Sequence, residues 1–168
     1  MMKHAFAPRA QDVMESTVHT MTPDLTLNEA IEFLKRHKMC NAAVVEIDAE
    51  GHRVLVGFLS EGDCLEHLSN EVFFGTPAPQ QTVRTMMRRH PVCIDPDMDI
   101  FTLASIFVNH RHRQLPVAQE GRLLGIVKRC DVLHALNEFY REAFKDKCSK
   151  KFPPNLQELV NHRFILKR

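Results

Sequence analysis

The chain has 168 residues, enough for one compact domain or for two small units that share a core. Hydrophobic residues make up 44% of it, and with eleven phenylalanines, one tyrosine and no tryptophan the core must depend on aliphatic side chains and methionine. The formal net charge of +1 excludes a molecule that attracts nucleic acid with its whole surface.

The N-terminus and the cysteines bear on where the protein resides. Residues 1–16 contain no long apolar core of the kind that a signal peptide needs. No stretch approaches the ~20 apolar residues required to span a bilayer. The five cysteines are an odd number without a C-x-x-C pair, which is typical of reduced thiols. We therefore expect a soluble, cytoplasmic protein that does not associate with membranes.

From residue 19 the sequence predicts a short extended piece, a helix, two strands and a second helix. Apolar residues recur at helical spacing from Leu27 to Leu34, and Thr26 with Glu29 forms a capping box in front of them. The turn between the strands contains Gly51, which supplies a positive φ. The expected elements lie, in chain order, at residues 19–21, from Leu27, at 42–47, at 54–59 and from Glu61.

The second half of the chain predicts the same series. Apolar residues recur at helical spacing from Ile100 to Phe107, with Asp99 as the N-cap, and Gly121 lies in the turn between the strands. The expected elements lie at residues 92–94, from Ile100, at 115–118, at 123–127 and from Arg129. Residues 71–81, which include Phe-Phe-Gly-Thr-Pro-Ala-Pro, are predicted to be a linker.

The two halves are copies of one unit. A shift of 73 positions aligns them without a gap as far as Val44 and Val117, and an insertion of five residues near 48–53 then reduces the shift to 68. A single βαββα unit would expose the back of its small sheet, so we expect it to need its twin. The predicted organisation is repeat 1 at 8–70, the linker at 71–81, repeat 2 at 82–140 and a basic extension at 141–168.

Most catalytic and metal-binding motifs are missing from the sequence. It has no Gly-rich phosphate loop, no H-E-x-x-H and no G-x-S-x-G. It also lacks the paired carboxylates and nucleophile–base arrangements that enzymes use. His110 and His112 are the best metal candidates, but on a helix such a pair points about 200° apart and cannot chelate from one face. We expect no catalytic residue, no metal site and no required cofactor.

The ends of the returning strands carry the most specific pattern. Copy one reads Gly57-Phe58-Leu59-Ser60-Glu61-Gly62-Asp63, and copy two reads Gly125-Ile126-Val127-Lys128-Arg129-Cys130-Asp131. In both, an acidic residue falls in the first turn of the next helix, where it can cap free N–H groups. The same carboxylate can also accept hydrogen bonds from ribose hydroxyls, as in dinucleotide folds. The repetition of the whole pattern favours the second interpretation.

The repeat resembles the CBS domain, named for cystathionine β-synthase, over residues 10–140. The motifs that carry the resemblance are Asp12-Val13-Met14, Thr20-Met21-Thr22-Pro23-Asp24, Gln114-Leu115-Pro116-Val117 and the two strand-end segments above. The resemblance implies an α/β (α+β) fold in which two βαββα repeats pack as a pseudo-two-fold module, followed by a C-terminal helical extension. It also implies two clefts, which in this family typically hold AMP, ADP, ATP or S-adenosylmethionine.

The same resemblance implies the roles of individual residues. Ser60 and Asp63 would hold ribose and phosphate in the first cleft, and Asp131 would hold ribose in the second. Arg113 would bind phosphate with help from Arg111. The candidates to enclose the adenine are Met21, Val44, Ile94 and Val117, which belong to the core instead if the clefts are empty. Thr20 and Pro116, which belong to the matching motifs, complete the candidate set.

The chain departs from the family pattern at two places. Copy one, with Lys38-Met39-Cys40-Asn41-Ala42-Ala43, lacks a basic residue directly before its strand. Copy two has Lys128 where the family usually has Thr or Ser, and this lysine either adds a phosphate contact or fills the pocket.

Two functions of different classes follow from these patterns. The first is a regulatory module that senses an adenosine-containing ligand and catalyses nothing. The alternative is a dimerisation or scaffold module that binds a protein partner and no small molecule. An apolar stripe on the second helices supports a homodimer through the helical faces, and its members are Leu65, Leu68, Leu133 and Leu136.

The C-terminal extension carries a local charge of +5, which leaves −4 on the rest of the chain. Its aromatic residues, Phe144, Phe152 and Phe164, are too widely spaced to form a stacking platform, so we do not expect nucleic-acid binding. Residues 137–148 are predicted to prolong the last helix of repeat 2, and Pro153-Pro154 to stop it.

Overall fold

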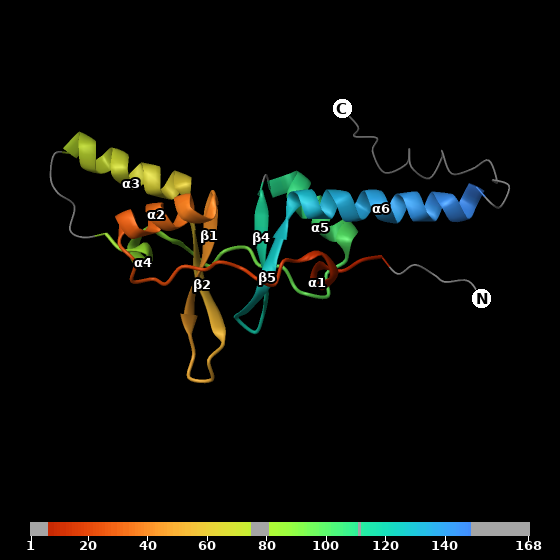
Figure 1. The fold of residues 1–168 in the computed structure, drawn as a ribbon, viewed down its shortest axis with the longest axis horizontal. Coiled ribbons are helices and arrows are strands. Elements are labelled where there is room, and N and C mark those ends of the chain that lie inside the picture. Colours follow the sequence, from red (N-terminus) through yellow and green to blue (C-terminus); the bar gives the residue numbers. More distant parts are fainter. Residues whose placement is uncertain (1–6, 75–80, 111, 149–168) are drawn as a thin grey trace, which may run out of the picture.

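The structure is a computed structural model that describes residues 7–74, 81–110 and 112–148 (Figure 1). The elements are α1 (Ala10–Val13), α2 (Leu27–His37), β1 (Asn41–Ile47), β2 (Arg53–Ser60), α3 (Glu61–Phe74), α4 (Val83–Met86), β3 (Arg88–Arg89), α5 (Ile100–His110), β4 (Gln114–Gln119), β5 (Arg122–Lys128) and α6 (Arg129–Cys148). They form two halves side by side, with β1 and β2 under α2 and α3 in one half and β4 and β5 beside α5 and α6 in the other. The predicted pair of βαββα repeats is confirmed.

The strands follow the order β1-β2-β5-β4, with β3 paired to β2. Each half is an antiparallel hairpin, and both hairpins have a register shift at the same place, after Val44 in β1 and after Val117 in β4. The hairpins meet at one residue pair, Val54 and Arg122. Beside it, the Leu55 N–H donates to the Gly121 carbonyl at 2.9 Å. The sheet is therefore nearly divided in two.

Caps fix the starts of the first helix in each half. The Glu29 carboxylate accepts from the Thr26 N–H at 2.8 Å, and the Glu29 N–H donates to the Thr26 hydroxyl at 3.3 Å, which is the predicted capping box of α2. In α5 the Asp99 carboxylate accepts from the N–H groups of Phe101 and Thr102, each at 3.0 Å. Both predicted N-caps are confirmed.

The start of each repeat packs into the core of the other repeat. We call residues 8–21 and 81–94 the leading segments, which the shift of 73 aligns with each other. Ala10, in the first leading segment, is fully buried among Ile100, Leu103 and other core residues of repeat 2. Val83, in the second, is fully buried in the core of repeat 1.

Backbone hydrogen bonds hold this exchange in matching positions. The Ala10 N–H donates to the Met98 carbonyl at 2.8 Å, and the equivalent Val83 N–H donates to the Leu25 carbonyl at 2.8 Å. A third cluster, built around Ala43, Val45, Leu123 and Ile126, joins the two hairpins. The exchange is the physical reason why one repeat needs its twin.

One helix end differs from that expected from the sequence, and another agrees with it. Helix α3 continues through residues 71–74, which were expected to belong to the linker, and residues 75–80 lie outside the described part. Helix α6 runs past residue 140 to Cys148, as predicted for residues 137–148, and the remainder of the extension also lies outside it. Within the described ranges, no helix combines the length and apolar character that crossing a membrane requires.

Candidate functional site

Two clefts lie between the repeats, each with a volume of about 380 Å³, within the range of small-molecule sites. Cleft A is formed by the start of α3, residues 88–92 and residues 112–116. Cleft B is formed by the equivalent parts, namely residues 126–130, residues 15–19 and residues 37–43. The Gln114 side chain donates to the side chain of Asn41, its equivalent in repeat 1, and both residues line both clefts.

Asp63 is the buried carboxylate of cleft A, with only 7% of its surface exposed. One carboxylate oxygen, Oδ2, accepts from the Ser60 N–H at 2.8 Å and from the Ser60 hydroxyl at 2.5 Å. The other, Oδ1, accepts from Nε of Arg88 at 2.9 Å. Burial raises the pKa of Asp63, but the hydrogen bonds from Ser60 and Arg88 outweigh it and leave that pKa below its ordinary value. Asp63 is therefore held ionised.

The capping interpretation of the strand-end motif is confirmed for this residue. The Asp63 N–H donates back to the Ser60 hydroxyl at 3.2 Å, so Ser60 and Asp63 form a capping box at the start of α3. The same carboxylate borders the cleft, because the helix begins at its wall.

The rest of cleft A is basic. Arg88 and Arg89 lie on β3, and His90 follows with a φ of 55°, a left-handed conformation that is uncommon outside glycine. Arg113 enters from the segment before β4. Several cationic groups therefore face a single buried carboxylate, an arrangement suited to an anionic ligand.

In cleft B the acidic and basic residues at two equivalent positions differ from those of cleft A. Lys128 stands where cleft A has Ser60, and Glu15 stands where cleft A has Arg88. The two side chains form an ion pair across the cleft wall. The hydrogen bond to Glu15 raises the pKa of Lys128. Asp131, the equivalent of Asp63, is half-buried and is not among the residues that line cleft B.

Stacked histidines form another wall of cleft B. The rings of His19 and His37 lie 3.9 Å apart between centroids at an angle of 29°, and Phe33 tilts against His37 at 4.6 Å. Burial, together with the charges of His19 and Arg36, lowers the pKa of His37. The sequence analysis missed these rings because the two histidines come from different segments that only the fold brings together.

Four of the predicted adenine-enclosing residues lie in the core instead of on the cleft walls. Met21 forms an isolated parallel β-bridge with Val44, and Ile94 forms one with Val117. Each of the four residues is at most 1% exposed. Their burial agrees with the core role, which the sequence left open beside adenine binding. Of the remaining candidates, Pro116 lines cleft A and Arg113 lines both clefts.

Thr20 is half-buried beside Met21 and is not among the residues that line either cleft. Arg111 lies outside the described residues. The sequence analysis overlooked Arg88 and Glu15, although the shift of 73 places one on the other.

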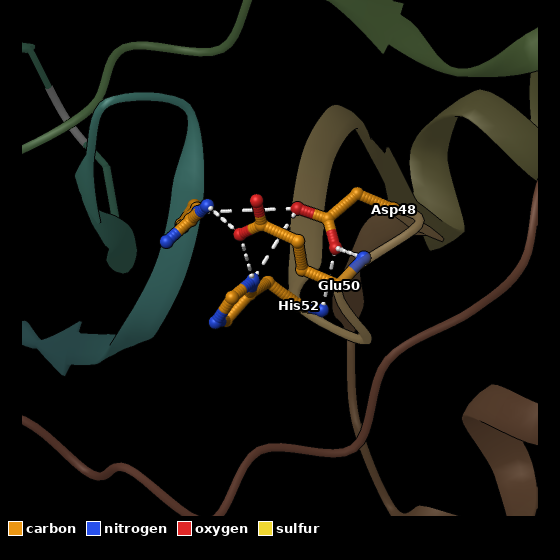
Figure 2. A network of polar contacts seen from close by, with 4 residues as sticks. Asp48, Glu50 and His52 are labelled. Atoms are coloured by element: carbon orange, nitrogen blue, oxygen red, sulfur yellow. Dashed lines mark hydrogen bonds and ion pairs between the residues drawn. The ribbon is translucent and has the colours of Figure 1, made fainter.

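A separate polar network joins the two hairpin turns. Figure 2 shows Asp48, Glu50 and His52 at the β1–β2 turn, with Nδ1 of His52 3.4 Å from an oxygen of each carboxylate. Arg122, at the start of β5, lies 2.7 Å from Glu50 and 3.9 Å from Asp48. The Arg122 guanidinium thus offsets part of the charge of the two carboxylates, and the network ties repeat 1 to repeat 2.

The family model for the CBS domain matches residues 10–70 and 83–138. The chain belongs to the CBS domain family. Its two CBS domains correspond to the two repeats, with their leading segments exchanged, and enclose clefts A and B.

Relatives of known sequence and structure share this pair of domains. The CBS domain-containing protein YhcV of Bacillus subtilis is 28% identical over 79% of this chain and 87% of its own. The crystal structure of CBSX2 in complex with AMP superimposes with a TM-score of 0.66 at 24% identity, covering 79% of this chain and 98% of CBSX2. The CBS domain pair of MJ0100, in complex with 5-methylthioadenosine and S-adenosylmethionine, gives 0.62 at 19% identity over 79% and 98%.

Proposed function

We propose that the two CBS domains form a regulatory module that binds an adenosine-containing ligand between them and has no catalytic activity of its own. The candidate ligands are AMP, ADP, ATP and S-adenosylmethionine. The observation that carries the proposal is cleft A, where a buried, ionised carboxylate faces a group of arginines and histidines. A carboxylate suits the ribose hydroxyls and the arginines suit phosphate. The AMP complex of CBSX2 and the S-adenosylmethionine complex of MJ0100 support the same ligand class.

The residues of cleft A come from both CBS domains, so a bound ligand acts on the arrangement of the two domains. Asp63 belongs to the first CBS domain, whereas Arg88 and Arg113 belong to the second. A ligand that contacts all three changes the relative stability of the domain arrangements, and this change is what a partner protein reads. In cleft B the corresponding candidate is Lys128, whereas Asp131 does not line that cleft.

Thermal unfolding with each of the four ligands at millimolar concentration tests the proposal. A ligand at ~100 times its Kd stabilises the fold by roughly 2.7 kcal/mol, which raises Tm by several degrees at this size. We expect such a shift with at least one ligand and a smaller shift in an Asp63→Asn variant. The absence of a shift with all four ligands would overturn the proposal.

A second candidate function is assembly, because each long helix exposes a leucine. Leu65 on α3 and Leu133 on α6 occupy equivalent positions and are 61% and 64% exposed, whereas Leu68 and Leu136 pack against the core. We propose a homodimer through these helical faces. Sedimentation of the protein and of a Leu65→Ser, Leu133→Ser variant tests it, and a monomer at micromolar concentration in the unmodified protein would overturn it.

A further inference from the structure

Three of the roughly four acceptor sites of the Asp63 carboxylate already have partners within the protein. Its Oδ2 atom is held by the N–H and hydroxyl groups of Ser60, and its Oδ1 atom by Arg88. With 7% of the residue exposed, no free edge remains for the two hydroxyls of a ribose. Ribose binding to this carboxylate therefore requires that one of the present partners leaves.

Arg88 is the partner that can leave. The Ser60 bonds belong to the capping box at the start of α3, so breaking them would damage the helix. Arg88 reaches the carboxylate from a different element, β3, and 76% of its side chain is exposed. The Arg88 guanidinium can therefore be hydrated when it leaves, and the buried carboxylate needs a new hydrogen-bond donor in its place, which the ribose hydroxyls supply.

The surroundings determine where the guanidinium goes. Arg89 and Arg113 line the same cleft as Arg88, so a phosphate that enters it meets a cluster of guanidinium groups. A nucleotide that takes the ribose position on Asp63 thus supplies Arg88 with a new anionic partner. An uncharged nucleoside supplies none and leaves Arg88 without a counter-ion.

We infer that Arg88 is a specificity-determining latch in cleft A, which closes on Asp63 in the free protein and opens onto the phosphate of a bound nucleotide. The inference rests on the proposed function and narrows it, because cleft A then selects phosphate-bearing nucleosides over bare ones. Cleft B has no such latch: Glu15 replaces Arg88 and pairs with Lys128, and Asp131 does not line that cleft.

Calorimetric titration with adenosine and with AMP tests the latch. In the unmodified protein we expect AMP to bind more tightly than adenosine. In Arg88→Gln the freed carboxylate binds adenosine about fivefold more tightly, while AMP binds more weakly. Both changes lower the ratio of AMP affinity to adenosine affinity. Arg89→Gln is the matched control, because it removes the neighbouring charge and leaves the Arg88–Asp63 pair intact. It weakens AMP binding without improving adenosine binding.

Asp63→Asn completes the experiment as a double-mutant cycle with Arg88→Gln. With no carboxylate to release, the Arg88 substitution no longer improves adenosine binding. An Arg88→Gln variant that leaves adenosine affinity unchanged, or that matches Arg89→Gln with both ligands, overturns the latch while the proposed function stands. If the unmodified protein gives no heat with either compound, the latch fails, and the thermal-unfolding test with all four ligands decides separately whether the proposed function stands.

Discussion

Asp63 and Asp131 occupy equivalent positions in the two CBS domains, yet the residue three positions earlier gives them different surroundings. Ser60 has a hydroxyl that accepts from the Asp63 N–H, so the two side chains cap α3 together. Lys128 has no acceptor atom and pairs with Glu15 instead, so it cannot form the same box with Asp131. One motif thus produces a buried carboxylate in one domain and a half-buried one in the other.

Asp63→Asn should lower the free energy of unfolding by about 1–3 kcal/mol, because it removes a capping carboxylate and the charge-assisted bonds to Ser60 and Arg88. Asp131→Asn is the matched control and should change stability by less than about 0.5 kcal/mol. Urea unfolding at neutral pH measures both. Equal losses in the two variants would show that the capping box at Ser60 does not distinguish the sites.

The contribution of Asp63 should also depend on pH. Its pKa in the folded protein lies below the ordinary value of 3.8, so the folded state favours the ionised form. The resulting stabilisation is complete above the ordinary pKa and is lost as the pH falls through the lowered one. We therefore expect the stability difference between the unmodified protein and Asp63→Asn to be constant from pH 7 to 5 and to shrink below pH ~4. Urea unfolding across this range checks it, and a difference that grows on acidification would contradict it.

At the scale of elements, the returning strands lie close to the leading segments. A Cβ atom on Gly125 in β5 would stand 2.7 Å from the Glu15 carbonyl oxygen, and one on Gly57 in β2 would stand 2.5 Å from the sulfur of Met87. The two glycines are equivalent and open the strand-end motif of each domain. Glycine at these positions lets the leading segments pair with the returning strands, which places Glu15 and Arg88 in their clefts.

Gly125→Ala should destabilise the fold by about 1–3 kcal/mol, since the obstructing atom is a backbone carbonyl that cannot move away alone. Glu15 and Ile126 exchange two backbone hydrogen bonds there, at 2.9 and 3.0 Å. Gly57→Ala should cost less, because the flexible Met87 side chain can shift. Gly62→Ala, near the start of α3, meets only an ordinary contact and should be neutral or stabilising. Thermal unfolding ranks the three, and a larger loss for Gly57→Ala would contradict this reading.

Local signals made the longer elements predictable from sequence. The capping box at Thr26, the short apolar runs of the strands and the turn glycines act within a few residues, so they can be read without the fold. Helices α1 and α4 have four residues each, too few for a periodic pattern, and they went unpredicted.

The candidate site was predictable only in part for a similar reason. Ser60, Asp63 and Arg113 lie in motifs and do line the clefts. Arg88, Glu15 and the stacked histidines come from segments whose neighbours are set by tertiary packing. The sequence also left open whether Met21 lies in the core or on a cleft wall, because an apolar strand residue fits both places.

At the scale of the whole molecule, the exchange of leading segments makes the two domains one cooperative unit. The strand pairing between the hairpins is a single residue pair, with the Arg122 network and the small cluster around Ala43 and Ile126 beside it. Ala10 and Val83 each contribute to the other domain's core, so neither domain has a complete core of its own. A ligand that moves one leading segment within a cleft therefore acts on the core of the opposite domain. Ligand binding in one cleft is thereby coupled to the packing of both domains.

Hydrogen exchange of two core variants tests this coupling. Val83 belongs to the second repeat, but Val83→Ala creates a cavity in the core of the first domain. It should lower the free energy of unfolding by roughly 2–3 kcal/mol. It should also speed amide exchange in α2 and β1 more than in α5 and β4. Ala10→Leu overfills the core of the second domain, so it should speed amide exchange in α5 and β4 more than in α2 and β1.

Val108→Ala is the control, because Val108 lies on α5 with 79% of its surface exposed and should alter neither set of amides. If Val83→Ala instead loosened α5 and β4 first, the leading segment would have to pack within its own domain. The two CBS domains would then be independent units joined only at their hairpins, and a ligand in one cleft would act on the domain arrangement through its direct contacts alone.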